Sequence, residues 1–449
     1  MRRHAFIKDS TLTFGARAAS VVTLAIVGIM VARQLGPEGK GVVALALMVP
    51  QFLFSVLNFG FGTAAIYLTG RERYTPQELA GATVISGIVL GVLSIGVFPL
   101  FAGWAFSGPL RGVSPGLVWL ALSSIPFLYL TVFMGDIFRA NGMMNLYNGG
   151  LFCVSIFKVI AIAAVLYWMR AGELGVIIAS WLGLFLLAAV QLVVVARRIG
   201  FARPPARAYK EMFAFGARVY SEAVLVTING RVAGFILNNY VDPSAVGFFT
   251  TADGLAEVLW HVPIAIGLVF LPFTARQDDE SAAKSTATLC RHTLWVVTAA
   301  AVLMVLAAPV VVPALYGPPF KAAVIPFMIM LPGVVLYSLM RVISTYLAGR
   351  GRPTLVMGLA AIVVASNLAL SLLLTPRHGI MGASVAISVA YVLSAAAALW
   401  LFVGIGHVSP SSVLLLRRPD LEVYRGVASA AARKLRRSFS ALGGNSDDA

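Results

Sequence analysis

The sequence predicts an all-α polytopic membrane protein of about twelve transmembrane helices, in two six-helix lobes related by a pseudo-two-fold axis along the membrane normal. Three observations lead to this fold class: an apolar composition, long apolar runs along the whole chain, and an internal repeat. Of the 449 residues, 59% are hydrophobic and only 12% are charged. A soluble protein carries about 25% charged residues, so this composition indicates a chain that lies in a bilayer.

Twelve apolar runs are long enough to cross about 30 Å of hydrocarbon as helices. The runs lack the two-residue alternation of a barrel strand, and an open sheet cannot satisfy its backbone in lipid, so helices are the structure that remains. The first and seventh runs contain charged residues. The predicted spans are 10–33, 42–69, 81–106, 117–138, 150–169, 175–196, 212–238, 247–273, 290–314, 323–347, 355–374 and 380–404.

The basic residues predict the orientation of these spans. If both termini are cytoplasmic, 23 of the 34 Lys and Arg residues lie in cytoplasmic segments, six lie in outer loops and five lie inside spans. Such a bias over short loops is the positive-inside signal. The net charge of +16 then reflects topology, and dispersed basic residues argue against a nucleic-acid partner. The N-terminal MRRHAFIKD leads into a full-length span, so we expect no cleavable signal peptide.

An internal repeat divides the spans into two sets of six. The tetrapeptide FGAR occurs at 14–17 and again at 215–218, near the start of the first and seventh spans. Each copy is followed by a proline and, four residues later, a glycine, at a constant offset of 206: Pro37 with Gly41, and Pro243 with Gly247. Two later matches, 138–148 with 347–357 and 172–180 with 377–384, keep the same order. The pattern predicts a duplicated six-helix unit.

The boundary between the repeats is predicted in a basic linker that contains Pro204 and Pro205, since consecutive prolines prevent a helix. Both repeats then begin and end on the cytoplasmic side, as parallel repeats do in transporters with a central cleft. The predicted domains are an N-terminal lobe at 1–196, the linker at 197–211, a C-terminal lobe at 212–404 and a cytoplasmic basic tail at 405–449.

Within the tail, apolar residues recur every four positions between 423 and 442, with basic residues around them. This pattern predicts an interfacial amphipathic helix on anionic lipid, followed by disorder, and a partly disordered basic tail is the alternative.

Five cations lie inside predicted spans, where an ionisable residue costs about 2.5–3.5 kcal/mol on insertion scales. They are Arg17, Lys158, Arg218, Arg231 and Arg341. All except Arg231 fall in the inner half of the bilayer, roughly 10–12 Å deep at 1.5 Å per residue. One interpretation is that they snorkel to the inner interface. The other is a cationic substrate site. Arg17 and Arg218 hold matching positions in the repeats, and guanidinium groups bind phosphate oxygens bidentately, so a lipid pyrophosphate is the ligand suggested.

Four further titratable groups are candidates for ion coupling or for counter-ions. Glu222 follows Arg218 by one helical turn, so the two share a helix face. Asp253, Glu257 and His261 form a stripe across the eighth span, whereas the repeat places Leu47, Gln51 and Ser55 at the equivalent positions of the second span. Proton coupling, a counter-ion for Arg231 or Arg218, and contact with substrate are the roles left open for this stripe.

Several classes of activity lack the residues that they require. The chain has no HExxH motif, paired CxxC or Walker-type glycine loop, so we expect no metal, no cofactor and no self-contained ATP-driven pump. The largest outer loop, about 106–116, is too short to hold a catalytic domain. The sequence therefore predicts a protein that is not an enzyme.

The opening of the chain, FGARAAS followed by VARQLGPEGKGVVALAL, resembles the polysaccharide-biosynthesis flippases of the multidrug/oligosaccharidyl-lipid/polysaccharide exporter superfamily. In that family an LGPxGxGxxALA stretch joins the first two helices, as residues 35–46 would here, and the GRGRP segment at 349–353 is similar to its corresponding turn. The resemblance covers about residues 10–404. These motifs are glycine and proline turns, which identify a fold better than a substrate.

The resemblance implies a flippase of the O-antigen or exopolysaccharide repeat-unit type in a prokaryotic inner membrane. Its cargo would be a polyprenyl-pyrophosphate-linked oligosaccharide, moved from the cytoplasmic to the outer leaflet by alternating access, with Arg17 and Arg218 at the pyrophosphate. Membrane lipids, a polysaccharide polymerase and glycosyltransferases are the partners implied. An ion-coupled multidrug-type antiporter and a lipid II-type flippase of the same superfamily are the alternatives, and five cations against three acids inside the spans argue against the antiporter.

Overall fold

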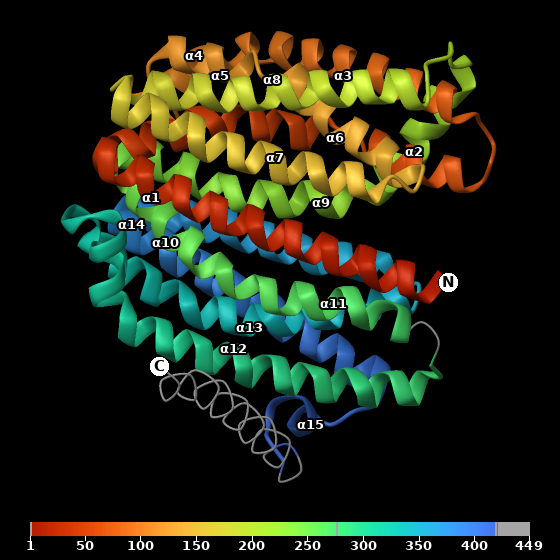
Figure 1. The fold of residues 1–449 in the computed structure, drawn as a ribbon. Coiled ribbons are helices and arrows are strands. Elements are labelled where there is room, and N and C mark those ends of the chain that lie inside the picture. The colour runs from red at the N-terminus through yellow and green to blue at the C-terminus, as the bar shows by residue number, and fades with distance from the viewer. Residues whose placement is uncertain (1, 275–276, 418–419, 421–449) are drawn as a thin grey trace, which may run out of the picture.

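The computed structural model describes residues 2–274, 277–417 and 420, and Figure 1 shows them as a bundle of long, roughly parallel helices. No strand occurs in these residues. Eight helical segments among them are long and apolar enough to cross a membrane, which confirms the prediction of an all-α multi-pass membrane protein.

The first half of the chain forms one side of the bundle (Figure 1). Its elements are α1 (Arg2–Leu57), α2 (Phe61–Gly70), α3 (Pro76–Val97), α4 (Pro99–Ser107), α5 (Pro115–Leu122), α6 (Ile125–Ala140), α7 (Met144–Ala163), η1 (Ala164–Trp168) and α8 (Gly172–Arg198). The second half supplies the other side. Its elements are α9 (Ala206–Tyr240), α10 (Pro243–Glu257), η2 (Val258–Trp260), α11 (His261–Thr274), α12 (Asp279–Tyr316), η3 (Pro318–Ala323), α13 (Val324–Gly349), α14 (Pro353–Gly406) and α15 (Pro410–Leu414).

The eight membrane candidates account for ten of the twelve predicted spans. Helices α1 and α14 each contain two spans, because Gly36 (φ 68°) and Gly379 (φ 53°) adopt left-handed backbone conformations that break the helix between them. The other two spans are α9, which carries several charged residues, and α10 with α11, which η2 divides into pieces of 15 and 14 residues. In these two spans, charged and polar residues interrupt the apolar sequence.

Both ends of the segment predicted as a linker are helical. Helix α8 continues to Arg198 and α9 begins at Ala206, so the non-helical segment is 199–205 rather than 197–211. Pro205 is the N-cap of α9, because a proline is compatible with the start of a helix but not with its interior. The backbone N–H of Ala202 donates to the Gln77 carbonyl over 3.1 Å, which fixes the linker against the start of α3.

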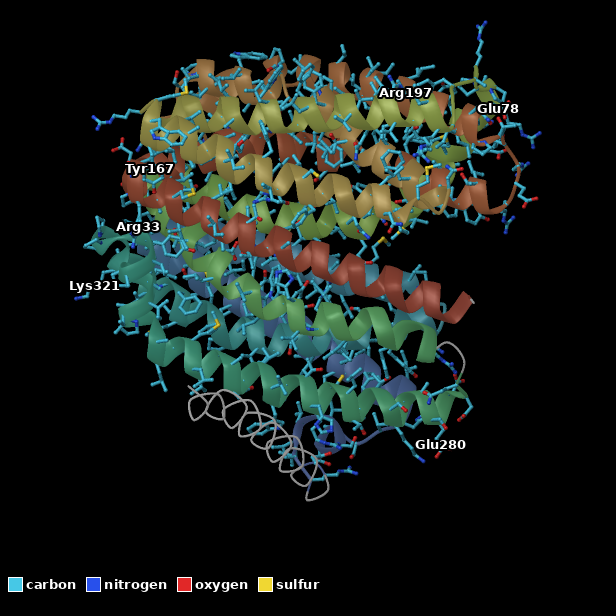
Figure 2. The ribbon with its side chains drawn as sticks, viewed as in Figure 1. Arg33, Glu78, Tyr167, Arg197, Glu280 and Lys321 are labelled. Carbon is cyan, nitrogen blue, oxygen red and sulfur yellow. The ribbon has the colours of Figure 1, made fainter. Side chains whose placement is uncertain are left out.

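Figure 2 shows how the labelled residues separate between the two ends of the bundle. Arg33 and Lys321, which are predicted to lie outside, are at one end with Tyr167, and Glu78, Arg197 and Glu280 are at the other. We call these the predicted outer end and the predicted cytoplasmic end, since their assignment to the two sides of the membrane rests on the charge bias.

At the predicted outer end, the repeated proline and glycine residues pack against each other. A Cβ added to Gly41 would overlap the carbonyl oxygen of Pro243, and one added to Gly247 would overlap the carbonyl oxygen of Pro37. Each glycine therefore receives the backbone of the proline from the other repeat, and α1 touches α10 without intervening side chains. We call this reciprocal contact the glycine–proline seam.

Side chains from the first repeat reinforce the seam. The Lys40 Nζ donates to Thr251 Oγ1 over 2.5 Å and lies 4.6 Å from the centre of the Tyr316 ring, a cation–π geometry. Arg33 Nε donates to the Leu315 carbonyl over 2.7 Å. The two halves are thus joined by backbone packing and by cations at the predicted outer end.

The halves also meet on a second helix pair, α2 and α9, toward the predicted cytoplasmic end. A Cβ on Gly60 would lie 2.6 Å from the Gly216 carbonyl oxygen, and Tyr67 stacks on Phe215 with ring centroids 3.9 Å apart. Asn58 Nδ2 donates to the Tyr220 hydroxyl over 3.3 Å. The second FGAR copy therefore contributes its phenylalanine and its glycine to packing between the halves.

Candidate functional site: a charged column beside α9

A cavity of about 200 Å³ lies in the second half of the bundle, between α9, α10, α13 and α14. Its polar lining includes Asn229 and Arg231 from α9, Glu257 from the end of α10, Trp260 from η2 and Tyr337 from α13. Asp253 lies ten residues after Pro243, the first residue of α10, which is roughly 15 Å along the helix, and Glu257 lies one helical turn further. The cavity is therefore near the middle of the predicted bilayer.

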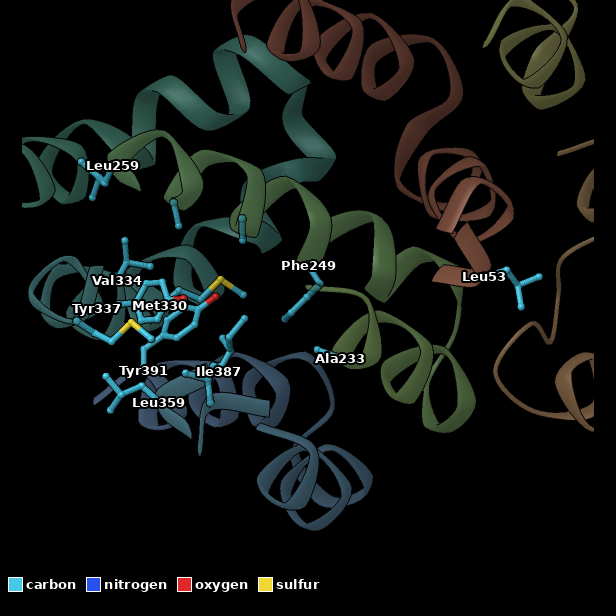
Figure 3. Close-up of a cluster of buried hydrophobic side chains, with 14 of the residues drawn as sticks. Leu53, Ala233, Phe249, Leu259, Met330, Val334, Tyr337, Leu359, Ile387 and Tyr391 are labelled. Atoms are coloured by element: carbon cyan, nitrogen blue, oxygen red, sulfur yellow. The ribbon is translucent and has the colours of Figure 1, made fainter. Parts of the chain in front are cut away.

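Three aromatic rings form one wall of this region. Tyr337 and Tyr391 stack with centroids 4.4 Å apart, and Trp260 lies 5.6 Å from the first ring and 5.8 Å from the second. Figure 3 shows the two tyrosines together among Met330, Val334 and other buried apolar side chains. Such packing fixes the positions of the polar atoms that point toward the cavity.

A buried amide network joins α9 to α14 beside the tyrosines. Asn367 Nδ2 donates to Asn229 Oδ1 over 2.9 Å, and Asn229 Nδ2 donates to the Tyr391 hydroxyl over 3.4 Å. Ser371 Oγ extends this hydrogen-bond network by donating to Asn367 Oδ1 over 3.2 Å. The sequence analysis missed this network, although asparagines inside apolar spans were a signal for it.

Arg231 is the cation of the cavity. It interacts electrostatically with both Asp253 and Glu257, which lie one helical turn apart and are half-buried. None of the carboxylate oxygens described by the structure approaches the Arg231 guanidinium within 4.0 Å. The counter-ion role of the acidic stripe therefore stays a prediction, as do proton coupling and contact with substrate.

The charges continue toward the predicted cytoplasmic end. Arg341 and Glu222 both interact with Tyr337, from α13 and α9 respectively. Arg218 precedes Glu222 by one turn of α9 and is exposed, and no ion pair within 4.0 Å joins the two in the described part of the chain. We call the set Arg218, Glu222, Arg341, Arg231, Glu257 and Asp253 the charged column.

The remaining predicted site residues lie elsewhere. Lys158 is half-buried on α7, in the other half of the bundle, and His261 is exposed at the start of α11. Arg17 belongs to α1, and its side chain lies outside what the structure describes. A site shared by Arg17 and Arg218 therefore stays a prediction.

The first repeat uses the equivalents of the acidic stripe differently. Ser55 is buried, and the Asn58 Oδ1 beyond it accepts from the Gly60 N–H over 3.2 Å, which stabilises the turn between α1 and α2. This half has a buried acid of its own, Asp136, which pairs with Arg139. The sequence analysis did not single out this pair. The second half of the bundle thus places two acids, Asp253 and Glu257, where the first repeat has neutral side chains.

The residues after α14 are fixed to α12 by a buried ion pair. Arg291 Nε lies 2.7 Å from Asp420 Oδ2, Arg291 Nη1 donates to the Ser412 carbonyl over 2.5 Å, and both charged side chains are buried. Trp295 Nε1 donates to the Leu414 carbonyl over 3.0 Å. The predicted amphipathic segment at 423–442 lies outside the described residues.

We expect Asp420→Asn to lower the unfolding free energy by about 1.5–3 kcal/mol at pH 7, the usual contribution of hydrogen bonds to a charged group. The hydrogen bond from Arg291 holds the pKa of Asp420 below its ordinary value. A depressed folded-state pKa means that the stabilisation is complete above the unfolded value near 3.9 and disappears at lower pH.

Thermal unfolding of both chains at pH 7 and at about pH 3.5 measures this effect, and the difference in Tm is expected to shrink at the lower pH. Glu280→Gln, which breaks the exposed pair with Lys284 on the same helix, is the control and should leave Tm nearly unchanged. A pH-independent difference would contradict the assignment to the ion pair.

The described residues contain no group of three or more His, Cys, Asp or Glu side chains that could hold a metal ion. The model of a protein family described as polysaccharide biosynthesis protein matches residues 30–325, about two thirds of the chain. The chain belongs to this polysaccharide biosynthesis family. The resemblance seen in the sequence is thereby confirmed.

One curated relative matches part of the sequence. Over 184 residues the chain is 23% identical to the uncharacterized membrane protein MJ1068 of Methanocaldococcus jannaschii, a match that covers 38% of this chain and 35% of that protein. The chain thus spans about a third of the length of this curated relative.

Two solved structures are similar over most of the chain. One is the lipid II flippase MurJ in an inward closed conformation, with a TM-score of 0.72, 15% identity and coverage of 89% of this chain and 90% of that one. The other is a MOP superfamily transporter from Pyrococcus furiosus, with a TM-score of 0.65, 16% identity and coverage of 89% and 94%. Both are transport proteins, and the likeness shows that the polysaccharide biosynthesis protein has their two-lobe fold.

Proposed function

We propose that this protein is a flippase that moves a lipid-pyrophosphate-linked oligosaccharide from the cytoplasmic to the outer leaflet, for surface polysaccharide synthesis. Family membership supports the pathway, and the two-lobe fold supports transport by alternating access. The observation that carries the proposal is the glycine–proline seam. A contact built from equivalent residues of both repeats can separate as a unit, which would open the predicted outer end.

The cationic side chains support an anionic cargo. Arg218 is exposed on the first helix of the second half, and Arg341 and Arg231 follow toward mid-depth. Guanidinium groups suit pyrophosphate oxygens because they bind them bidentately. Arg218 makes no ion pair within 4.0 Å with Glu222, so its guanidinium would be available to a phosphate group.

Exchange of both FGAR arginines tests the proposal. We expect Arg17→Ala with Arg218→Ala to lower export of surface glycan by at least about tenfold, as two charge-assisted phosphate contacts are lost. Quantification of surface polysaccharide and of lipid-linked intermediates in cells measures it, with protein in the membrane checked by immunoblot. The matched control exchanges Lys321, an exposed cation of η3, for alanine. Normal surface glycan in the double variant would overturn the phosphate site.

A lipid II-type flippase is the second candidate, since MurJ shares the fold. Complementation decides between them: rescue of a strain lacking its lipid II flippase would favour this candidate, and rescue only of surface polysaccharide export favours the proposal. A polymerase or glycosyltransferases that dock on the protein would then be found by co-purification from the complemented strain.

A further inference from the structure

A crevice of about 480 Å³ lies between the two halves of the bundle near the predicted outer end, and it is separate from the charged column. The first half contributes the part of α1 after Gly36 and α4, and the second half contributes α9 and α14. Its lining is mostly aromatic and aliphatic, including Phe52, Phe101, Trp104, Phe235, Ile236 and Leu372. Volumes of this size are typical of sites for small organic ligands.

The crevice is closed toward the seam and the predicted outer surface. Asn238 Nδ2 donates to the carbonyls of Pro109 and Arg111, each over 2.9 Å, which draws the loop after α4 over the crevice. Phe52 and Phe235 meet edge to face, with centroids 6.1 Å apart, where the two halves join. Trp104 is 67% exposed and Leu372 48% exposed, so the open side faces the surrounding hydrocarbon between α4 and α14.

The crevice combines an uncharged lining with a cation at its edge, as a site for an amphiphilic ligand requires. Its lining contains no Asp, Glu, Lys or Arg. Arg111 is exposed directly after Leu110, which lines the crevice, and its Nη2 donates to the Val241 carbonyl over 3.3 Å. Trp104 and Tyr240 line the crevice near this cation, as aromatic side chains do at the level of lipid headgroups. An apolar slot therefore ends beside one cation at the predicted interface.

We propose that this crevice binds one phospholipid of the outer leaflet, with an acyl chain between α4 and α9 and the phosphate on Arg111. The glycine–proline seam closes the predicted outer end in this conformation, so the cargo of a flippase would not yet be in the outer leaflet. A resident phospholipid is therefore favoured over the chain of a transported lipid. This choice of occupant rests on the proposed flippase function, whichever lipid is the cargo.

Photolabelling of the full chain in detergent, with phosphatidylglycerol that carries a diazirine in one acyl chain, tests the proposal. We expect labels on peptides 98–110 and 232–240, in excess over the lipid-facing peptide 302–311 of α12, and displacement by unlabelled phosphatidylglycerol. Ala105→Trp fills the crevice and should abolish these labels. Gly149→Trp, in the separate apolar hollow between α7 and α8, is the matched control and should leave them unchanged.

Arg111→Gln separates the phosphate contact from the acyl-chain contact. It should reduce labelling by phosphatidylglycerol roughly fivefold and leave labelling by a diacylglycerol with the same diazirine chain unchanged. Labels that persist in Ala105→Trp, or that match those on peptide 302–311 of α12, would overturn the site. Displacement by a polyprenyl phosphate but not by phosphatidylglycerol would assign the crevice to the cargo and overturn the proposal. Competition on the unmodified chain keeps the test valid if Ala105→Trp misfolds.

Discussion

Gly41→Ala is expected to separate α1 from α10 and to open the predicted outer end. The added Cβ would overlap the Pro243 carbonyl oxygen, which is backbone and cannot rotate away. Gly247→Ala should act in the same way through Pro37. Overpacking costs about 1–3 kcal/mol, and a bias of that size shifts a two-state equilibrium roughly 5- to 150-fold.

A cysteine at Thr251, which Lys40 contacts in the closed seam, reports the separation. With Cys153 and Cys290 replaced by alanine, labelling of Thr251→Cys by a membrane-impermeant thiol reagent should rise in Gly41→Ala. Gly28→Ala on α1 and Gly254→Ala on α10 are matched controls, because nothing lies within 4 Å of a Cβ at either position. Each of the four glycine-to-alanine exchanges raises helix propensity, so a loss of helix propensity cannot explain a difference in labelling between seam and control variants. Equal labelling in seam and control variants would contradict the gating role.

Arg231→Met is expected to destabilise the second half of the bundle by roughly 1 kcal/mol, because Asp253 and Glu257 are half-buried and lose a nearby cation with which they form no ion pair within 4.0 Å. The substitution retains an apolar side chain of similar length but removes the cation that interacts with Asp253 and Glu257. Thermal unfolding in detergent measures the change. Lys321→Met, at an exposed cation of η3, controls for the loss of one positive charge.

The double variant Arg231→Met with Glu257→Gln distinguishes a counter-ion from a coupling group. If Glu257 balances Arg231, the double variant regains part of the Tm that the single variant loses, since coupled residues are not additive. If Glu257 instead carries a proton during transport, Glu257→Gln alone should abolish the dependence of transport on a pH gradient in liposomes. Strictly additive Tm changes would exclude the counter-ion role.

The parts of the fold that follow from local chemistry could be predicted from the sequence. Apolar runs gave the helices, and Gly36 and Gly379 break α1 and α14 where outer loops were expected. The prediction missed the true ends of the linker, because the cations at 197–198 and 206–211 continue the flanking helices as far as the prolines allow. Charge alone does not end a helix.

The site was predictable only where its residues share one helix. The four-residue spacing of Asp253 and Glu257 placed them on one face, and Arg231 or Arg218 was the counter-ion considered for them. The bond between Asn229 and Asn367 joins residues 138 positions apart, and the Tyr391 contact spans 162, so no local pattern pointed to either. The FGAR repeat predicted a shared charge, and its second copy also proved to supply packing through Phe215 and Gly216.

The ion pair between Arg291 and Asp420 has a consequence for how the chain is made. Its partners are 129 residues apart, so the ribosome adds Asp420 roughly 6 to 26 s after Arg291 at 5–20 residues per second. During that interval α12 enters the membrane with an arginine that lacks its final acidic partner. The predicted cytoplasmic end of α12 lets this side chain reach water in the meantime. We therefore expect the contact between Arg291 and Asp420 to form late in biogenesis, after α14 has been synthesised.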